Sequence, residues 1–445
     1  MLLYSNLIDE VGKMEPEDYY GCVTGVRGLF IEVSGIRRRL SIGDRCNVCA
    51  SGGRKVVCEL VSFMDERLLL MPYGSLEGIG LGCRVEVENA APVIYPHPSW
   101  LGRIINAFGE AIDGKGPLIK GSKPYYIKSS PPPAQFRDRV CGKVDLGVKA
   151  VNAFLTICKG QRMGIFAGSG VGKSTLMSMM AKNTDSDISV IGLIGERGRE
   201  AKEFVEDTLG EEGLAKSVLV LATSDESPLM RRQAAYTTMA VAEYFRDQNK
   251  NVLCMMDSIT RFAMAQREIS LTVGEPPASK GYTPSVFAEL PRLLERAGPG
   301  AGTGTITGLF TVLVDGDDHN EPVADAVRSI LDGHIVLDRA IAERGRYPAI
   351  NILRSISRTM PDCDTPEEYA IVAKARKYIA AYENMAELIR LGAYKKGSNR
   401  EVDEAIFYYP KIEEFLSQRK GEKVTLPECY QQLDAILSEP YVPGN

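Results

Sequence analysis

Short apolar runs with alternating polar residues characterise the first part of the chain. Between Tyr19 and Val87 the runs are separated by glycines, and the two clearest are Leu29, Ile31, Val33 and Val56, Cys58, Leu60, with Glu32 and Glu59 on the opposite face. A period of two is the spacing of a strand that buries one face. Five or six such strands at short intervals predict a small β-barrel.

A second pattern begins at Lys159, where continuous apolar runs alternate with segments of helical spacing. This alternation is typical of buried parallel strands joined by helical crossovers. The runs are 163–167, Ile188–Ile194, Val218–Leu221, Val252–Met256 and Ile306–Val314. They predict a central, mainly parallel sheet covered by helices.

Beyond Pro366 the apolar positions recur every three or four residues, which predicts helices packed as a bundle. The recurring residues are Val372, Ala375, Ile379, Tyr382, Ala386 and Ile389. Pro92–Pro98 is a predicted linker, and the proline-rich stretch Ser129–Ala134 is a predicted ordered loop. The sequence therefore predicts an α/β protein with a barrel domain at 1–90, a central domain at 91–365 and a helical domain at 366–445.

Two features near the N-terminus allow more than one interpretation. Leu3, Leu7, Val11 and Met14 have helical spacing over barely three turns, so residues 1–14 form either a docking helix or a frayed start. Arg37–Arg39 is a basic cluster, either a solvated loop or a subunit contact. A nucleic-acid-binding face on this barrel is disfavoured because the region is acidic and poor in aromatic residues.

Composition narrows the class of protein. The 445 residues are 44% hydrophobic and 25% charged, with a net charge of −5. This overall charge gives no indication that the protein binds nucleic acid or an anionic membrane. No apolar run approaches a membrane span, and the N-terminus lacks the features of a signal peptide, so we expect a cytoplasmic protein. The ten cysteines include a pair with metal-ligand spacing, Cys46 and Cys49, but no matching second pair follows. We expect these cysteines to pack as small hydrophobes.

The strongest chemical signal is the glycine-rich stretch between Ala167 and Thr175. It lies between a predicted strand and a predicted helix, the setting in which backbone N–H groups and a helix N-terminus cradle phosphate. Lys173 is expected to reach the β- and γ-phosphates, and the Ser174 hydroxyl to ligate Mg²⁺. The expected ATP-binding residues are Gly168, Ser169, Gly170, Val171, Gly172, Lys173, Ser174 and Thr175. Ala167 replaces the first glycine of the usual pattern, at a position where a small residue suffices.

Two acidic residues lie at the C-terminal ends of predicted strands, close to where this loop is expected. Asp257 ends the run Val252–Met256 and is expected to hold Mg²⁺ through its water shell, although a cap on the helix that follows is an alternative role. Glu196 follows Ile188–Ile194 and is expected to position or deprotonate the attacking water. Arg197 and Arg199 are expected to form ion pairs or to contact a neighbouring subunit.

These motifs resemble a known family. The phosphate loop, Gly195–Glu200, Met256–Phe262 and Leu337–Ile350 resemble the hexameric ATPases of rotary ATP synthases and type III secretion. Closer similarity to the flagellar protein-export ATPases lies in Ala234–Thr238, Arg261–Ile269, Gly274–Pro277, Lys280–Pro284, Phe287–Gly298 and Asp315–Pro322. The C-terminal segment lacks the acidic loop of the synthase catalytic subunit. Its sequence at Gly392–Gly397 resembles the secretion enzymes instead.

The resemblance implies a RecA-like central domain and a homohexamer with ATP at the subunit interfaces. Tyr347 matches the aromatic residue that stacks on adenine, and Arg358 matches an arginine inserted into the neighbouring subunit's site. The implied partners are a stator-like regulator, a central-stalk-like protein, membrane proteins of the export gate and chaperone–substrate complexes. The implied location is the cytoplasmic face of the inner membrane.

The motifs are compatible with four functions. The first is ATP hydrolysis that drives the unfolding and delivery of flagellar subunits to an export gate. The second is the injectisome version of the same machine, and the third is a hexameric RNA translocase. A non-catalytic nucleotide-binding subunit is the fourth, and Glu196 disfavours it because such subunits dispense with a water-positioning carboxylate.

Overall fold

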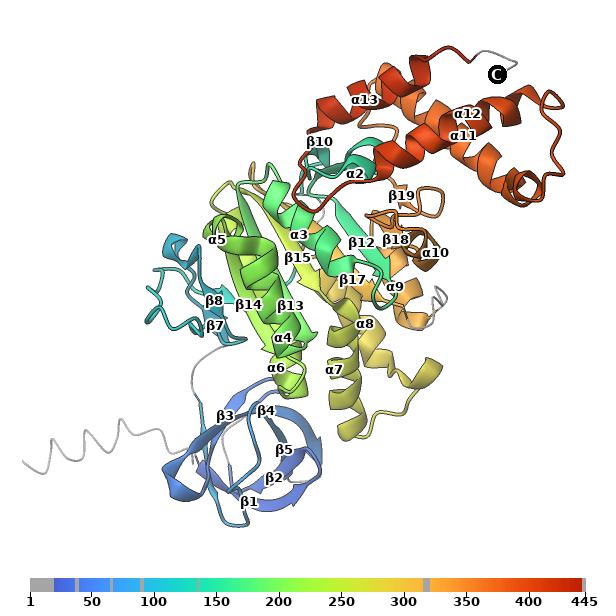
Figure 1. Cartoon of the computed structure of the whole chain (residues 1–445). Helices are drawn as coiled ribbons and strands as arrows, with labels where there is room; N and C mark the ends of the chain where they lie inside the picture. Colours follow the sequence, from blue (N-terminus) through green and yellow to red (C-terminus); the bar gives the residue numbers. More distant parts are fainter. Residues whose placement is uncertain are drawn as a thin grey trace, which may run out of the picture.

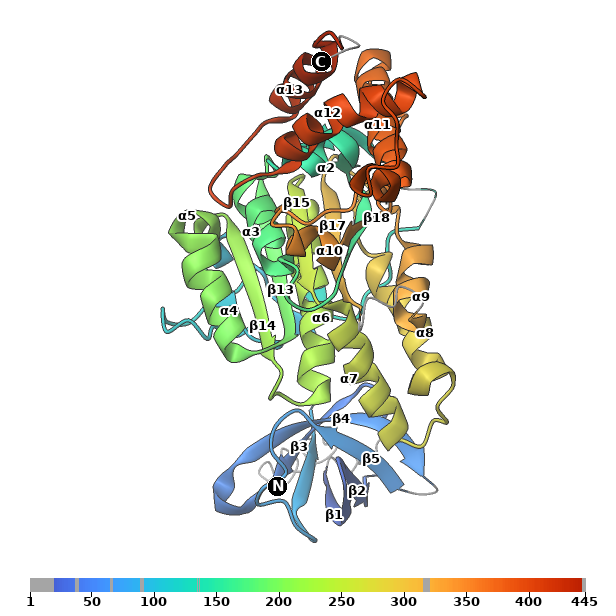
Figure 2. The same ribbon diagram turned by 45° about the vertical axis from the view of Figure 1, so that its right-hand side comes forward.

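The computed structural model describes residues 20–36, 40–64, 67–88, 92–133, 135, 137–314 and 321–441. A barrel, a sheet covered by helices and a group of C-terminal helices follow one another along the long axis of the molecule (Figure 1). The same succession is visible after rotation (Figure 2). The predicted leading helix at 1–14, the Arg37–Arg39 cluster and residues 315–320 lie outside the described residues.

The N-terminal part is a closed six-stranded barrel with the order β1-β2-β5-β4-β3-β6. Its strands are β1 (Tyr20–Arg27), β2 (Phe30–Ser34), β3 (Arg45–Cys49), β4 (Lys55–Met64), β5 (Arg67–Pro72) and β6 (Arg84–Val87), with the short helix η1 (Ser51–Gly53) between β3 and β4. Ile31, Val33, Val56, Cys58 and Leu60 fill its interior, as the alternation predicts.

Two acidic residues of the barrel depart from the simple alternation. Glu32 and Glu59 face away from the interior, yet only 1% and 3% of their surfaces are exposed. Arg27 and Arg67 form ion pairs with Glu32, and Arg232 of the central part forms one with Glu59. Leu29, in contrast, is 38% exposed because it lies in the turn before β2. The sequence pattern does not reveal what packs against the outer face of a strand.

The central part is a nine-stranded sheet with the order β19-β18-β12-β17-β15-β13-β14-β8, and β16 is paired with β17. Its bounds are β8 (Ile104–Ile105), β12 (Arg162–Ala167), β13 (Ile188–Glu196), β14 (Ser217–Thr223), β15 (Asn251–Asp257), β16 (Gly298–Pro299), β17 (Thr305–Leu313), β18 (Gly333–Leu337) and β19 (Ile356–Ser357). Neighbouring strands are parallel in the pairs β8–β14, β14–β13, β13–β15, β15–β17, β17–β12 and β12–β18. Strand β19 runs antiparallel to β18. The carboxyl ends of β12, β13 and β15 therefore meet at one edge.

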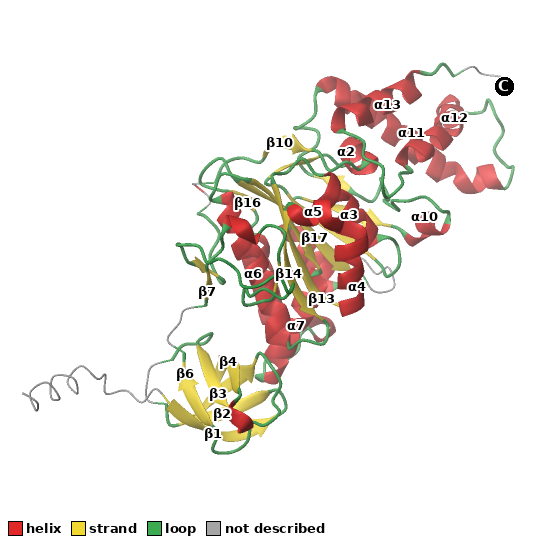
Figure 3. Cartoon of the chain, turned by 60° about the vertical axis from the view of Figure 1, so that its left-hand side comes forward, coloured by secondary structure: helices red, strands yellow, loops and turns green. Residues whose placement is uncertain are grey.

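Helices cover both faces of this sheet (Figure 3). On one face lie α3 (Lys173–Asn183), α4 (Gly198–Glu203), the π-helical η4 (Phe204–Leu209) and α5 (Gly210–Ala215). On the other lie α6 (Pro228–Arg246), α7 (Ile259–Thr272), α8 (Pro284–Leu294) and α9 (Pro322–Ile330). Each face has its own apolar core, because alternate residues of the buried strands point to opposite sides.

The C-terminal part consists of α11 (Pro366–Arg390), α12 (Arg400–Leu416) and α13 (Leu426–Ser438). Thr365 and Thr425 form capping boxes with Glu368 and Glu428, which fixes where α11 and α13 begin. Tyr382 and Tyr409 stack with ring centroids 3.8 Å apart and join α11 to α12. Among the described residues no helix is long and apolar enough to cross a membrane.

Smaller elements connect these parts. They are β7 (Val93–Ile94), β9 (Tyr125–Tyr126), β10 (Cys141–Val144), β11 (Ile157–Lys159), α2 (Lys149–Phe154), α10 (Arg339–Glu343), η2 (Pro98–Trp100) and η5 (Ser279–Gly281). The predicted linker at Pro92–Pro98 contains β7, which pairs with β9. The predicted α/β fold with an N-terminal barrel, a mainly parallel central sheet and C-terminal helices is confirmed.

Candidate active site

The glycine-rich loop lies between β12 and α3, at the sheet edge where the parallel strands end. Gly170 and Gly172 have φ angles of 78° and 91°, a left-handed backbone that favours glycine. α3 begins at Lys173, and Ser174 and Thr175 are exposed in its first turn. The loop therefore combines free N–H groups, a helix N-terminus and accessible hydroxyls, the donors that a phosphate chain needs.

Lys173 contacts both candidate carboxylates. Its Nζ lies 2.5 Å from Oδ1 of Asp257 and 3.4 Å from Oε1 of Glu196. Burial alone would lower the pKa of Lys173, but Asp257 and Glu196 outweigh it and raise that pKa. The ammonium group is thus held charged beside the loop, and the three side chains predicted from separate segments lie together.

Asp257 lies at the end of β15 and is 4% exposed. The Thr311 hydroxyl on the neighbouring strand β17 donates a hydrogen bond of 2.6 Å to Oδ1 of Asp257. The alternative role of Asp257 as a helix cap is wrong, because Ser258 caps α7 by accepting from the N–H of Arg261. Sequence reasoning missed Thr311, although it is one of the few polar residues within that buried run.

The carboxyl group of Glu196 has an unusual proton affinity. Burial and the nearby Asp257 raise its pKa to about 7, and a hydrogen bond with Glu200 acts in the same direction, while Lys173 opposes them. A carboxylate with this affinity can accept a proton near neutral pH. Glu200 was not predicted to take part. Arg197 and Arg199 form exposed ion pairs with Glu200 and Glu203, which is one of the two roles expected for them.

Tyr347 lies against the phosphate loop. A Cβ atom at Gly172 would lie 3.5 Å from Cδ1 and Cε1 of the Tyr347 ring, and the residue is 44% exposed. Its carbonyl oxygen accepts a hydrogen bond of 2.8 Å from the N–H of Gln418, which fixes the backbone beneath the ring. The ring thus has exposed surface beside the loop, where a base could stack.

Arg358 lies far from the loop of its own chain. It follows β19, whose Ser357 pairs with Gly333 at the start of β18, whereas Leu337 at the end of β18 pairs with Ala167 beside the loop. Four residue steps of a strand separate these points by about 13 Å. Arg358 is exposed. The fold therefore does not bring Arg358 to the other candidate residues within one chain.

The donor set suits a magnesium–nucleotide complex. Mg²⁺ prefers oxygen ligands and retains several waters, and the exposed Ser174 hydroxyl and the Asp257 carboxylate supply such oxygens. Arg339 donates a hydrogen bond of 3.2 Å to the carbonyl oxygen of Ser169, a contact with the loop that the sequence did not reveal. The residues present fit the group that the resemblance implies.

Comparison with known families gives two matches along the chain. The family model described as ATP synthase alpha/beta family, nucleotide-binding domain, matches residues 147–357. The model described as T3SS EscN ATPase C-terminal domain matches residues 365–435. The first match spans the phosphate loop, both carboxylates and Tyr347.

Two relatives that are similar over nearly their full length carry the same name. The flagellum-specific ATP synthase of Caulobacter vibrioides is 58% identical over 98% of this chain and 100% of its own length. That of Bacillus subtilis is 51% identical over 97% of this chain and 98% of its own length.

Solved structures agree with this match. The assembled ATPase EscN from the enteropathogenic E. coli type III secretion system has a TM-score of 0.88 and 38% identity, covering 94% of this chain and 100% of that chain. EscN in complex with its central stalk EscO has a TM-score of 0.86. The chain belongs to the family of the flagellum-specific ATP synthases and is an ATPase.

Proposed function

We propose that this chain is the ATP-hydrolysing motor of flagellar type III protein export. It acts as a homohexamer with Mg²⁺–ATP at the subunit interfaces, and hydrolysis drives chaperone release, unfolding and delivery of flagellar subunits to an export gate. The observation that carries the proposal is the convergence of Lys173, Glu196 and Asp257 at the phosphate loop. Similarity to flagellum-specific ATP synthases supplies the export context.

Nucleotide binding must first rearrange the three side chains. In the structure the positive charge of Lys173 is shared by Asp257 and Glu196. When phosphate oxygens enter the loop, Lys173 moves to the β- and γ-phosphates and releases Glu196. Mg²⁺, when bound, neutralises developing charge on the phosphate oxygens, and Ser174 and Asp257 are the residues that would hold it.

Glu196 then acts on the attacking water. Its raised pKa, caused mainly by burial and Asp257, gives it the proton affinity of an effective base near pH 7. Glu200 orients it through the hydrogen bond between the two carboxyl groups. Glu196 positions the water in line with the γ-phosphate and accepts its proton as the phosphorus–oxygen bond forms.

The remaining parts of the site come from Tyr347 and a second subunit. Tyr347 stacks on adenine with its exposed ring beside the loop. Arg358, at the opposite end of β18, enters the neighbouring subunit's site and stabilises the charge of the transition state. The relative EscN is described as an assembled ATPase, which supports an oligomeric arrangement.

The proposed partners follow from the export role. EscN has been solved with its central stalk EscO, and we infer a central-stalk-like protein for this chain as well. A stator-like regulator, membrane proteins of the gate and chaperone–substrate complexes complete the set. The chain works in the cytoplasm at the face of the inner membrane, in three domains of residues 1–90, 91–365 and 366–445.

The injectisome form of this motor is the second candidate. Its catalytic geometry would be the same, and EscN, from the type III secretion system of enteropathogenic E. coli, has the same fold. The flagellar form is favoured because the flagellum-specific relatives are 45–58% identical, against 38% for EscN.

Export in cells tests the proposal. In a strain whose own gene is deleted, the wild-type chain should restore flagellar subunits to the culture supernatant. Glu196→Gln should fail to restore normal export although the protein is present at the same level. Restored secretion of injectisome substrates without flagellar subunits would favour the second candidate. No rescue of either pathway by the wild-type chain would contradict an export role.

A further inference from the structure

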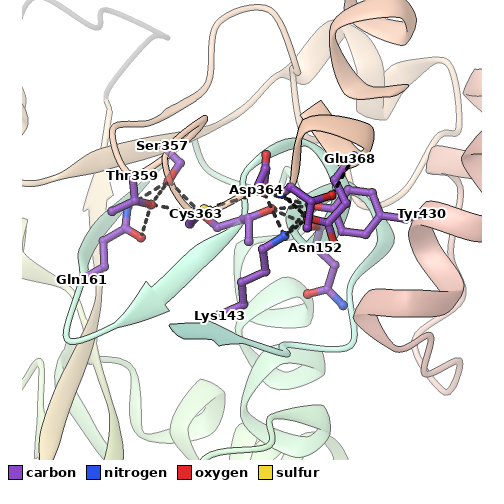
Figure 4. Close-up of polar contacts among 11 residues, drawn as sticks. Lys143, Asn152, Gln161, Ser357, Thr359, Cys363, Asp364, Glu368 and Tyr430 are labelled. Carbon is purple, nitrogen blue, oxygen red and sulfur yellow. Dashed lines mark hydrogen bonds and ion pairs between the residues drawn. The ribbon is translucent and has the colours of Figure 1, made fainter. Parts of the chain in front are cut away.

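A hydrogen-bonded polar cluster lies at the end of the sheet opposite the phosphate loop, where β10 and β11 meet the segment after β19 (Figure 4). Gln161 Nε2 donates to Ser357 Oγ at 2.9 Å, and Ser357 Oγ donates to the carbonyl oxygen of Thr156 at 2.8 Å. Thr359 Oγ1 donates to Oε1 of Gln161 at 2.9 Å. Arg358 is therefore flanked by two anchored residues.

Two thiols lie within this cluster. Cys158 on β11 and Cys363 are neighbours, although 205 positions separate them in the numbering of the chain. The N–H of Cys158 and the hydroxyl of Thr359, on the segment that carries Cys363, both donate to Oε1 of Gln161, at 2.8 Å and 2.9 Å. Cys158 is buried, whereas Cys363 is partly exposed. Both belong to the ten free cysteines among the described residues. Because they are neighbours, the cluster contains a pair of thiols that can react with each other.

A cation stands beside the pair. Lys143 is the cross-strand neighbour of Cys158, so both side chains lie on the same face of the β10–β11 hairpin. Its Nζ lies 2.9 Å from Asp364 and 2.6 Å from Glu368, and Asp364 directly follows Cys363. The ion pairs thus hold the segment that carries Cys363 against the strand that carries Cys158.

The two thiols share their protons unequally. The neighbouring Cys363 thiol lowers the pKa of Cys158 to about 7, with help from Thr359 and Lys143, although burial opposes it. The proximity of Cys158 and burial raise the pKa of Cys363. The pair therefore holds one negative charge near neutral pH, and a thiolate is the form that oxidants attack.

We propose that Cys158 and Cys363 form a reversible disulfide when a hydroperoxide reaches them, and that this bond slows ATP hydrolysis by fixing the segment that carries Arg358. The effect on hydrolysis rests on the proposed function, whereas the disulfide itself does not. The sulfurs must close to about 2.05 Å, which draws the Ile356–Asp364 segment further onto β11.

The chemistry balances with hydrogen peroxide as oxidant. The charged sulfur attacks one peroxide oxygen, the O–O bond breaks, and hydroxide leaves and takes up a proton to become water. The second sulfur then attacks the resulting sulfenic sulfur, the S–O bond breaks, and a second water leaves with the remaining thiol proton. A small-molecule dithiol restores both cysteines by thiol–disulfide exchange.

The barrel contains a matched comparison. Cys46 and Cys58 also face each other across β3 and β4, but burial raises the pKa of Cys46 to about 12 and that of Cys58 as well. Both are fully buried. The two residues are close to each other, but neither thiol is deprotonated near neutral pH, so we expect this pair to stay reduced.

The test treats the purified full-length protein with hydrogen peroxide, blocks free thiols, and maps peptides without reduction. A Cys158–Cys363 linked peptide, lighter by about 2 Da than the sum of its parts, is expected. It should be absent in Cys363→Ser and in Cys158→Ser and retained in Cys46→Ser. Oxidation without that link, or a link at Cys46–Cys58 in its place, would overturn the proposed disulfide.

ATPase activity is the second measurement. In the wild-type protein the rate should fall about tenfold or more as the link forms, since a misplaced arginine finger removes a contribution of that size or larger. Dithiothreitol should restore it, and Cys363→Ser should resist the oxidant. Full activity with the link formed would overturn the regulatory part and leave the ATPase assignment untouched.

Discussion

Lys173 and Asp257, 84 positions apart in the chain, form a buried ion pair with Nζ and Oδ1 2.5 Å apart. The contact joins the first turn of α3 to the end of β15, and Glu196 reaches the same ammonium group at 3.4 Å. Removing either partner leaves a charge in a buried site and also removes a group to which we assign a role in ATP hydrolysis.

We expect Lys173→Ala and Asp257→Ala each to reduce ATP turnover to less than about a tenth of the wild-type rate. Lys173→Ala removes a phosphate contact, and Asp257→Ala removes a residue expected to hold Mg²⁺. Steady-state phosphate release at saturating Mg²⁺–ATP measures both effects. Either variant turning over at a rate close to wild type would show that the site is wrongly assigned.

Glu196→Gln should separate binding from chemistry. The amide keeps the shape of the side chain but cannot accept the proton of water, so ATP should bind with nearly unchanged affinity while hydrolysis stops. Calorimetric titration of ATP, paired with a single-turnover assay, makes the distinction. A joint collapse of affinity and rate would reduce Glu196 to a binding residue.

Thr311→Val tests how Asp257 is held in place. The substitution preserves the shape of the side chain but removes the hydroxyl that donates to Oδ1 of Asp257 at 2.6 Å. We expect turnover to fall about tenfold and the Mg²⁺ concentration for half-maximal activity to rise, as for other groups that orient a metal ligand. Thr305→Val, at the other end of β17, is the matched control. Equal effects of the two substitutions would mean that Thr311 has only a packing role.

Acid should weaken the contact between the barrel and α6, in which Glu59 pairs with Arg232. Burial alone would raise the pKa of Glu59, but Arg232, Lys128 and the Tyr73 hydroxyl outweigh it and lower that pKa to about 2. A lowered folded-state pKa gives stability that is complete above the unfolded value of about 4.5 and is lost as pH falls from there toward 2.

Glu59→Gln should therefore destabilise the protein at pH 7 by about 3 kcal/mol, since Arg232 is left buried without its anion. The difference from wild type should shrink as pH falls below about 4.5. Thermal unfolding across this range measures it. Glu86→Gln, which removes an ion pair with the exposed Lys55, is the control and should shift the midpoint little. A pH-independent difference would contradict the role given to Glu59.

The sequence predicted the elements of the fold because the periodicity of apolar residues is a local property. It also predicted that Lys173, Glu196 and Asp257 lie close together, since strand ends in a parallel sheet meet at one edge. It could not predict Thr311, whose role depends on which strand lies beside β15, nor the burial of Glu59, which depends on the packing of Arg232 from α6. The pairing of Cys158 with Cys363 likewise exists only in three dimensions.

The roles of Arg358 and Tyr347 rest on resemblance together with position, and the domain limits at 90 and 365 stay a prediction. Arg358 links catalysis to assembly, because β19 places it at the opposite end of β18 from the loop of its own chain. If it completes the site of a neighbour, then catalysis requires assembly.

Mixed rings of two inactive variants test this most directly. Arg358→Ala supplies an intact Glu196, and Glu196→Gln supplies an intact Arg358, so in randomly mixed rings about a quarter of the interfaces are complete. An equal mixture of wild type with the variant that carries both substitutions also has about a quarter of its interfaces complete. This control mixture shows whether a ring that contains inactive sites can still hydrolyse ATP. If Arg358 acts on the neighbouring subunit's site, the rate of the complementary mixture should rise well above that of either parent and approach that of the control mixture. A complementary mixture that stays as inactive as its parents, in confirmed mixed rings and beside an active control, would contradict it.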